Sequence, residues 1–350
     1  MTKVHRYIRH IFAPAVGELW TNDDLLARIG KHLQTVDQPQ DAKESLQKLI
    51  RLFLIGSRSR YVQCPNFLDL RAFSEHAEAF AAAANESLAI LATEIRAAGG
   101  PKLDAIIGVS SAGQILPGIA DRTANLLGDL VDPTTCLLDL GNGGCTASSR
   151  ALQLVANFGS EIREALIVIA EPTSTLADAQ TLDRANWQGI CTFGDGAAAV
   201  WLTMDRDRAQ AELKDIHSFH GKEAGLIQWD HGGNYYRFGI TESDQFERRV
   251  RSQILEAMNR LEPSEHDDNT LWAVHPAGMM LVLSVARRLG IDRAGLEPSI
   301  RHFRQFSNMS SASVIHILKE LLDQANPGRQ FRWLSMGAGF HVVSGSGRKL

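Results

Sequence analysis

The chain lacks the features that would place it in several large classes of protein. Its four cysteines form no CxxC pair and no metal-ligand spacing, and no signal peptide is recognisable, so neither a metal site nor a disulfide framework is predicted. The formal net charge of −4 provides no overall basic field for nucleic acid. No apolar run reaches the ~18 residues of a membrane span. We therefore expect a cytoplasmic protein with reduced thiols that binds neither nucleic acid nor a membrane.

The remaining composition is that of an ordinary globular protein, with 350 residues of which 44% are apolar and 22% charged. The first 100 residues read as helical, with residues 21–24 capping one helix and Gly99-Gly100 ending an alanine-rich one. Four short apolar runs then alternate with helical stretches, at residues 104–111, 136–141, 164–171 and 197–204. Buried strands that alternate with helices predict an α/β fold with covered sheets.

The same pattern begins again after about residue 205. Strands are expected within 235–241 and 271–276 and a final strand within 331–340, with helices over 244–261, 281–290 and 311–325. The polar stretch 262–270 is expected to be a surface loop. The chain is thus predicted to consist of two similar α/β halves, residues 1–205 and 206–350, although their residues show no simple repeat.

Cys145 is the first of three candidate reactive side chains. It follows Gly143-Gly144 and opens the helical stretch TASSRALQLVANF. Two glycines allow a tight bend that exposes the sulfur, and the positive end of a helix dipole favours the thiolate. The plainer alternative is a buried, inert cysteine, because cysteine is among the most buried residue types.

His275 and Asn308 are the other two candidates. His275 ends the strand LWAV and precedes Pro276, which keeps it out of helical geometry. Asn308 lies in SNMSSAS before a helix, where its amide could donate a hydrogen bond to an oxyanion. A core histidine and a helix-capping asparagine are the plainer alternatives. Together, a thiol, an imidazole and a carboxamide can hold an acyl thioester and stabilise the oxyanion formed when a malonyl unit loses carbon dioxide.

Five motifs in the same order make the chain resemble the type III polyketide synthases, the chalcone synthase-like enzymes of the thiolase superfamily. They are the Cys145 segment, SSAGQILPG, FGDGAAAVWL, HPAG and SNMSSASVIHILKEL, and the likeness extends from about Gln47 to Phe340. The resemblance implies a thiolase-like five-layered αβαβα fold of two related halves and a homodimer. It also implies CoA thioesters as substrates, no further cofactor, and a role in secondary metabolism.

Carried over by this resemblance, Cys145 is the nucleophile that accepts the starter acyl group, His275 is its base, and His275 with Asn308 binds the thioester carbonyl and the enolate. Phe193 corresponds to an aromatic gatekeeper, and Tyr236 is expected to be the second. Leu116 corresponds to a residue that reaches across the dimer into the neighbouring pocket. Further pocket positions are expected, with core packing as the alternative, at Ser111, Ala112, Thr173, Leu176, Ile227 and Ser310.

A cationic segment resembles the part of the family that meets the CoA phosphates. The expected phosphate ligands are Lys48, Arg51, Arg58 and Arg60, and a solvated cationic helix face is the alternative. The chain also departs from the family pattern: residues 337–341 read GAGFH in place of GFGPG, Ser307 replaces a usual glycine, and Ile227 stands where many plant enzymes have glycine.

The resulting hypothesis is an acyltransferase that condenses an acyl-CoA starter with malonyl-CoA, with loss of carbon dioxide and few extensions. The departures favour few extensions because Ile227 would shorten the pocket. The first alternative is a ketoacyl-carrier-protein synthase III-like enzyme that uses an acyl-carrier protein or a non-malonyl acceptor. The second is a non-catalytic thiolase-fold partner subunit, although such subunits usually lose one of the three reactive residues and this chain has all three.

Overall fold

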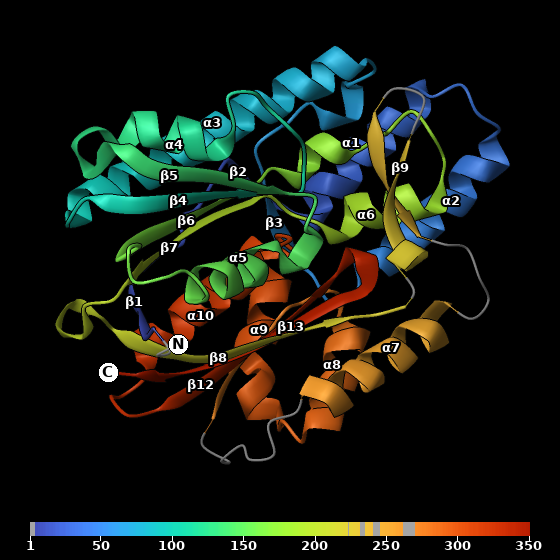
Figure 1. Ribbon diagram of the computed structural model, residues 1–350. Helices are drawn as coiled ribbons and strands as arrows, with labels where there is room; N and C mark the ends of the chain where they lie inside the picture. Colours follow the sequence, from blue (N-terminus) through green and yellow to red (C-terminus); the bar gives the residue numbers. More distant parts are fainter. Residues whose placement is uncertain (1–3, 223, 232–234, 241–245, 262–269) are drawn as a thin grey trace.

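The computed structural model describes residues 4–222, 224–231, 235–240, 246–261 and 270–350. Its main sheet has the strand order β11-β12-β13-β8-β1-β7-β6-β4-β5 (Figure 1). These strands are β1 (Arg6–Phe12), β4 (Leu103–Ser110), β5 (Val131–Gly141), β6 (Glu164–Glu171), β7 (Gly196–Thr203), β8 (Ala211–His220), β11 (Leu271–Val274), β12 (Gln330–Gly337) and β13 (His341–Lys349). Two small antiparallel pairs join β2 (Glu18–Thr21) to β3 (Ser59–Val62) and β9 (Ile227–His231) to β10 (Tyr236–Ile240).

The main sheet divides into two halves at a short seam. Strand β1 pairs with β7 along most of its length, from Tyr7 to Phe12. It pairs with β8 only through Arg6–Ile8. The first half therefore consists of β1, β7, β6, β4 and β5, and the second of β8, β13, β12 and β11.

Ten helices of the described chain complete a five-layered arrangement (Figure 1). They are α1 (Asn22–Thr35), α2 (Gln40–Phe53), α3 (Phe73–Ala98), α4 (Ile119–Leu127), α5 (Ala147–Ala156), α6 (Arg184–Thr192), α7 (Phe246–Leu261), α8 (Met279–Leu289), α9 (Arg293–Phe306) and α10 (Ala312–Gln324). Helices α5 and α10 lie between the two sheet halves and share one core with both. Helices α3 and α4 cover the outer face of the first half, and α7, α8 and α9 cover that of the second.

This arrangement confirms the thiolase-like αβαβα fold. Helix α10 shows why the middle layer can form, since it is apolar on nearly all sides and buries Val314, Ile315, Ile317 and Leu318. A helix that is apolar all round needs cover on all sides, and two sheets provide it. The division of the chain at residue 205 stays a prediction.

Several local signals in the sequence have the predicted structural effect. Thr21 caps α1, with its side chain accepting from Asp24 N while the Asp24 carboxylate accepts from Thr21 N. Helix α3 ends before Gly99, whose φ of 61° lies in the region that favours glycine. The wholly buried strands β6 and β7 fall on the predicted apolar runs.

Three expectations about elements need correction or lie outside the structure. The first 100 residues are not all helical, because β1 lies in the middle of the main sheet and β2 pairs with β3. The strand near 331–340 is not the last, since β13 follows and lies between β12 and β8. Both errors concern strands whose sequences mix charged or glycine residues with apolar ones. Residues 262–269 of the predicted loop lie outside the described residues.

None of the helices in the described part of the chain has the length and hydrophobicity needed to cross a bilayer.

Candidate active site

Cys145 lies at the bend between β5 and α5, in a one-turn 3-10 helix over Gly144–Thr146. Gly144 has a φ of 55°, and a Cβ added there would lie 3.2 Å from the backbone nitrogen of Ala338. A Cβ added at Gly143 would lie 2.7 Å from the Cβ of Ala147. Both glycines are therefore required by the close approach of chain segments, as predicted for a bend that presents the sulfur.

Asn308 is brought to Cys145 from the link between α9 and α10. Its Nδ2 atom lies 3.9 Å from Cys145 Sγ. The amide has a defined orientation because its Oδ1 accepts a hydrogen bond from Ser310 N at 2.9 Å. Its backbone is held as well, since Asn308 N donates to Thr192 O and Gly194 N donates to Asn308 O. Asn308 is thus a rigidly placed donor beside the sulfur and does not cap α10, whose N-cap is Ser311.

His275 directly follows β11 and is fully buried. Its backbone N donates to Leu334 O at 2.8 Å, which places it beside β12. Neither ring nitrogen has a hydrogen-bond partner among the described residues. Burial lowers the pKa of His275 to about 3, so the imidazole is neutral at physiological pH.

The charge state expected for Cys145 is contradicted by its surroundings. The pKa of the thiol is raised to about 12, by burial above all and by the carboxylate of Glu171, although hydrogen bonds from Ser310 and Asn308 lower it. Desolvation is the largest of these influences. Burial thus favours the uncharged form of both Cys145 and His275.

Glu171 is a site residue that the sequence reasoning missed. It ends β6 with no exposed surface, and its carboxylate accepts from Ser111 N at 2.8 Å and Ser311 Oγ at 2.5 Å. Burial raises its pKa to about 7, despite these hydrogen bonds. A signal was present in the run EALIVIAE, because an acidic residue that closes a fully apolar strand must be buried with partners.

Three of the predicted pocket residues contact buried carboxylates: two contact Glu171 and one contacts Asp195. Ser310, in the left-handed region with a φ of 50°, hydrogen-bonds to Glu171 and Cys145. Ser111 Oγ also donates to Gly144 O at 3.4 Å. Thr173 Oγ1 instead donates to the buried Asp195 at 3.1 Å. Ser310 is therefore beside the Cys145 sulfur, and Ser111 contacts the residue before Cys145.

The other three predicted pocket residues pack in or against hydrophobic cores. Ala112 is fully buried within the core between α3, α4 and the first sheet half. Leu176 packs against the same core, and Ile227 packs against the core of the second half. These placements match the alternative of core packing, and contact with substrate at these positions stays a prediction.

Phe193 contacts an aromatic side chain that the sequence did not single out. It lies edge-on to Phe238, with ring centroids 5.4 Å apart. Tyr236, two residues before Phe238 on β10, stacks on Trp229 with ring centroids 5.2 Å apart. Phe238 is therefore a further candidate for the second gatekeeper, and the role expected for Tyr236 stays a prediction.

Phe193 is also tied to Asn308 by a parallel β-bridge. An aromatic side chain and the amide donor thus share one rigid piece of backbone. Residues 193 and 308 are far apart in sequence, and this pairing brings them together.

The four predicted phosphate ligands separate into two groups. Lys48, Arg51 and Arg58 are exposed and able to meet an anion. Arg60 is only 2% exposed, and its guanidinium donates to the carbonyls of Ile190 and Phe193 at 2.9 Å each. This placement contradicts a role for Arg60 in CoA binding and assigns it to holding the end of α6.

Leu116 lies far from the core, with 94% of its side chain exposed. Among the described residues, no group of histidine, cysteine or acidic side chains is arranged to hold a metal ion.

Two family descriptions match parts of the chain. Residues 233–345 match "Chalcone and stilbene synthases, C-terminal domain". Residues 138–219, which include Cys145, match "3-Oxoacyl-[acyl-carrier-protein (ACP)] synthase III".

Three curated relatives have the names of synthases, one of them a type III polyketide synthase. A putative chalcone synthase of Bacillus subtilis is 26% identical over 68% of this chain and 68% of its own length. Bisdemethoxycurcumin synthase of Oryza sativa is 29% identical over 63% of this chain and 57% of its own. Type III polyketide synthase 10 of the same plant is 24% identical over 70% of this chain and 65% of its own. The chain therefore matches between roughly half and two thirds of the length of these relatives.

Solved structures agree over nearly the whole chain. The C-terminal type III polyketide synthase domain of Steely1 from Dictyostelium superposes with a TM-score of 0.82 and 17% identity, covering 99% of each chain. The 1,3,6,8-tetrahydroxynaphthalene synthase of Streptomyces coelicolor gives a TM-score of 0.83 and 20% identity, covering 98% of this chain and 99% of its own. At these identities the likeness establishes the fold.

The fold is the thiolase-like one of these type III polyketide synthase structures, and the two family descriptions that match parts of the chain are those of chalcone and stilbene synthases and of 3-oxoacyl-[acyl-carrier-protein] synthase III. Within the thiolase superfamily the chain is a relative of the chalcone synthase-like type III polyketide synthases, as its motifs predicted. The names of the curated relatives do not favour the synthase III alternative.

Proposed function

We propose that this protein transfers an acyl group from an acyl-CoA to Cys145 and condenses it with malonyl-CoA. The observation that carries the proposal is the 3.9 Å approach of the oriented Asn308 amide to Cys145 Sγ. A donor in that position faces the oxygen of a thioester formed on the sulfur.

The first half of the reaction loads the enzyme. Because both groups start uncharged, His275 takes the thiol proton as Cys145 Sγ attacks the thioester carbonyl. The new carbon–sulfur bond forms as the bond to CoA breaks, and the proton passes to the departing CoA thiolate. The product is an acyl-enzyme thioester and free CoA.

The second half forms the carbon–carbon bond. Malonyl-CoA loses carbon dioxide, and the electron pair of the broken bond becomes an enolate whose oxygen accepts hydrogen bonds from Asn308 and His275. Each such donor contributes roughly 3–4 kcal/mol to the stability of a developing oxyanion. The enolate carbon attacks the Cys145 thioester, giving a β-ketoacyl-CoA and a thiolate that takes up one proton.

The number of extensions is proposed to be small. Ile227 fills space against the second-half core that a glycine would leave open. Phe193, which is bridged to Asn308 and packs on Phe238, is proposed to narrow the pocket as well.

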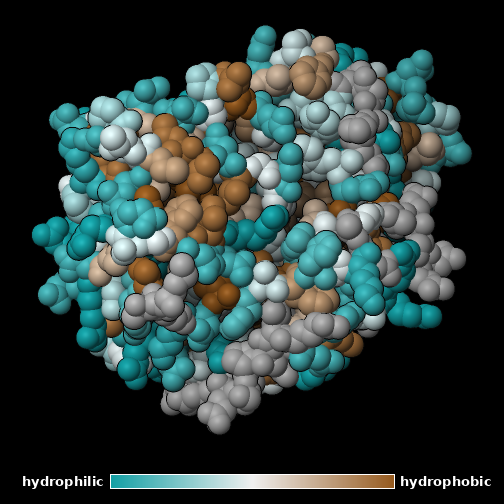
Figure 2. All heavy atoms as spheres, in the orientation of Figure 1, coloured by the Kyte–Doolittle hydropathy of each residue, from teal (hydrophilic) through white to brown (hydrophobic). Residues whose placement is uncertain are grey.

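A homodimer is part of the same proposal. Strand β5 is the free edge of the first sheet half, and Leu138 on it is 41% exposed. Figure 2 shows apolar side chains gathered on the face where β5 lies in Figure 1. A second copy would cover this edge and the exposed Leu116, which fits the expectation that Leu116 enters the neighbouring pocket. A cytoplasmic location fits the proposed CoA substrates.

The test is incubation of the purified protein with malonyl-CoA and a panel of aliphatic and aromatic acyl-CoAs beside Cys145→Ala. Mass spectrometry should find an acyl adduct on Cys145 and short malonyl-derived products that the variant does not form. Adducts without any malonyl-derived product would point to simple acyl transfer. Absence of both, with every donor, would contradict the proposal and favour a non-catalytic partner subunit.

A further inference from the structure

The described part of the chain buries four histidines, and their rings differ in how they are held. His32 and His76 each donate to a backbone carbonyl oxygen at 2.8 Å through one ring nitrogen. No bond of this kind holds His275 or His302 among the described residues, and Nε2 of His302 has no partner there. An unpartnered polar atom in the interior costs free energy, so packing alone does not explain a histidine at position 302.

His302 reaches the same level of the second half as His275, from a different element. Val274 N, on β11, donates a hydrogen bond to Ser299 Oγ, on α9, at 3.0 Å. His302 follows Ser299 by three residues and so lies on the same face of α9, whereas His275 directly follows Val274. Both segments lead to the reactive site, since α9 ends two residues before Asn308. The two imidazoles are therefore neighbours beyond the end of β11.

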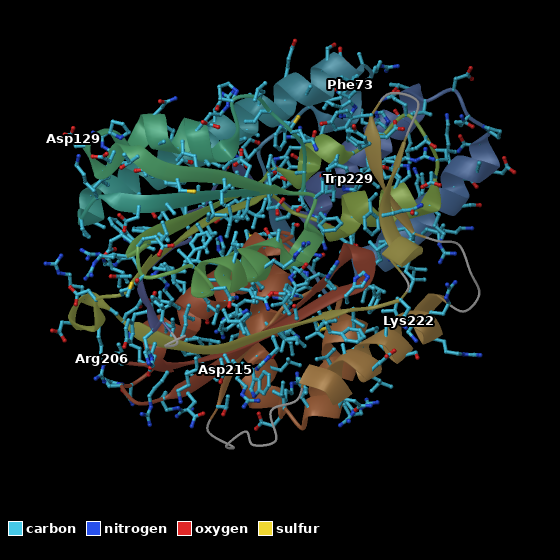
Figure 3. The ribbon with its side chains drawn as sticks, viewed as in Figure 1. Phe73, Asp129, Arg206, Asp215, Lys222 and Trp229 are labelled. Carbon is cyan, nitrogen blue, oxygen red and sulfur yellow. The ribbon has the colours of Figure 1, made fainter. Side chains whose placement is uncertain are left out.

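The His302 ring is fixed by the aromatic side chains around it. The rings of Phe306 and His316 pack on it, with centroid distances of 5.4 Å and 5.8 Å. His316 is held in turn, because its Nε2 donates to Ala197 O at 2.9 Å. Helices α9 and α10, which carry these rings, lie side by side near the centre of the molecule, where side chains fill the space around them (Figures 1 and 3). The His302 ring thus has a defined position beside His275.

The surroundings of His302 keep its imidazole uncharged. Burial lowers the pKa of His302 well below its ordinary value, and the neighbouring rings of His316 and His275 lower it further. An uncharged imidazole has one N–H and one nitrogen with a free lone pair. His302 can therefore accept a hydrogen bond.

The proposed loading step requires such an acceptor near His275. When His275 takes the proton of Cys145, its ring becomes an imidazolium that carries an N–H on both nitrogens. One of them delivers the proton to the departing thiolate, and the other needs an acceptor because an unpaired buried charge is costly. Hydrogen bonds of this kind are often long in the free enzyme and shorten when the reaction charges the ring.

We propose that His302 is a positioning residue that accepts a hydrogen bond from the imidazolium form of His275. The second N–H of His275 donates to Nε2 of His302, whose own proton then lies on Nδ1. The inference rests on the proposed function, because the charge on His275 comes from the thiol proton of Cys145. That proton passes from His275 to the CoA thiolate, so His302 is unchanged when loading ends. Its effect is to orient the His275 ring and to stabilise its transient charge.

Two substitutions separate the hydrogen bond from the packing. His302→Phe keeps a ring of similar shape without an acceptor, whereas His302→Gln places an amide oxygen close to the position of Nε2. Single-turnover acylation of Cys145 by acyl-CoA, followed by mass spectrometry, should slow by about tenfold in His302→Phe and by less than about threefold in His302→Gln. The acyl-CoA concentration that gives half the maximal rate should stay the same in both. Urea unfolding should find His302→Phe at least as stable as the unmodified protein, because the substitution removes an unpartnered buried nitrogen.

A double-mutant cycle tests whether His302 acts through His275. Alkylation of Cys145 by iodoacetamide requires loss of the same thiol proton and can be measured with or without His275. His302→Phe should slow alkylation by about tenfold in the unmodified protein and by less than about twofold in the His275→Ala background. His32→Phe is the matched control, since His32 is also buried and its Nδ1 also lacks a partner among the described residues, but it lies in the core around α1, α2 and α6. This control should leave both rates unchanged.

The outcomes distinguish this inference from the proposed function. No acylation of Cys145 by any acyl-CoA in the unmodified protein would contradict the proposed function, while the alkylation cycle would still test the link between the two histidines. Rates in His302→Phe equal to those of the unmodified protein, an equal loss in His302→Gln, or an equal loss with and without His275 would overturn the inference alone. Failure of His302→Phe to fold would also overturn it, because His302 would then be a structural residue.

Discussion

Asn308 is aimed at Cys145 by its own neighbour in the chain. Ser310 N occupies the Oδ1 atom of the amide at 2.9 Å, which leaves Nδ2 facing Cys145 Sγ at 3.9 Å. The side chain can therefore only donate toward the sulfur. An oxyanion formed on a Cys145 thioester would meet a donor that needs no rearrangement.

Replacing Asn308 by alanine tests this donor. Malonyl decarboxylation should slow by roughly 10²–10³, the usual loss for one oxyanion donor, whereas acylation of Cys145 should continue. Release of carbon dioxide and the mass of the acyl-enzyme measure the two steps separately. An equal loss in both steps would show that Asn308 stabilises the oxyanion formed during acylation of Cys145 as much as the enolate.

Ser307 explains one departure from the family pattern and offers a stability test. Its φ of 61° and ψ of −153° belong to a region that glycine adopts readily and other residues do not. The strain costs about 1–3 kcal/mol, and the hydrogen bond from Ser307 Oγ to Ser59 O returns about 1 kcal/mol of it.

Ser307→Gly should therefore raise the free energy of unfolding modestly, and Ser307→Ala should lower it by about 1 kcal/mol, since alanine keeps the strain and loses the bond. Urea unfolding of both variants gives the comparison. A glycine variant no more stable than the alanine variant would contradict strain at this position.

Glu171 should make stability depend on pH. Its pKa in the folded protein is about 7 against an ordinary 4.5, so the folded state holds this proton more tightly than the unfolded state. The stabilisation is complete below about pH 4.5 and is lost as the pH rises to about 7. Glu171→Gln should make the fall in stability over this window less steep, as measured by urea unfolding at several pH values.

The same substitution has an effect on the thiol. The Glu171 carboxylate raises the pKa of Cys145, so its removal should speed alkylation of Cys145 by iodoacetamide above pH 7 more than below it. A constant ratio of rates for the two proteins across the pH range would show that Glu171 carries no charge near the sulfur.

The aromatic contact at 5.4 Å predicts that Phe238 and Tyr236 differ in function. Phe238→Ala should change which acyl-CoA donors are accepted by opening the space beside Phe193. Tyr236→Ala should alter donor preference much less, because its ring stacks on Trp229. Values of kcat/KM over a series of acyl chain lengths decide between them, and a larger change in the Tyr236 variant would favour Tyr236 as the second gatekeeper.

Replacing Arg58 and replacing Arg60 should have different effects, one on substrate binding and the other on stability. Arg60→Ala should destabilise the protein by about 2–3 kcal/mol, because it leaves two buried carbonyls without charged donors. Arg58→Ala should raise KM for acyl-CoA with little change in stability, since Arg58 is exposed. Unfolding curves and KM should be measured for both variants. A higher KM without loss of stability in Arg60→Ala would contradict the structural role of Arg60.

Sequence reasoning succeeded where the chemistry of a residue is set by its immediate neighbours. The Gly143-Gly144 bend, the Thr21 cap and the buried strands β6 and β7 each depend on a few adjacent residues, and each is present. It failed for β1, because an N-terminal strand with His and Arg side chains acquires its place only by pairing with β7 and β8. It failed for Arg60 too, because nothing near that residue in sequence reveals the carbonyls at 190 and 193.

The sequence by itself determined the family relationship, the α/β class and the identity of Cys145, His275 and Asn308 as candidates, because motifs and apolar periodicity are local properties. Only the tertiary structure decided how these groups are charged and which side chains accompany them. Burial, not sequence position, raises the pKa of Cys145 and Glu171 and lowers that of His275. Likewise the pairing of Phe193 with Phe238 arises from chain segments that packing alone brings together.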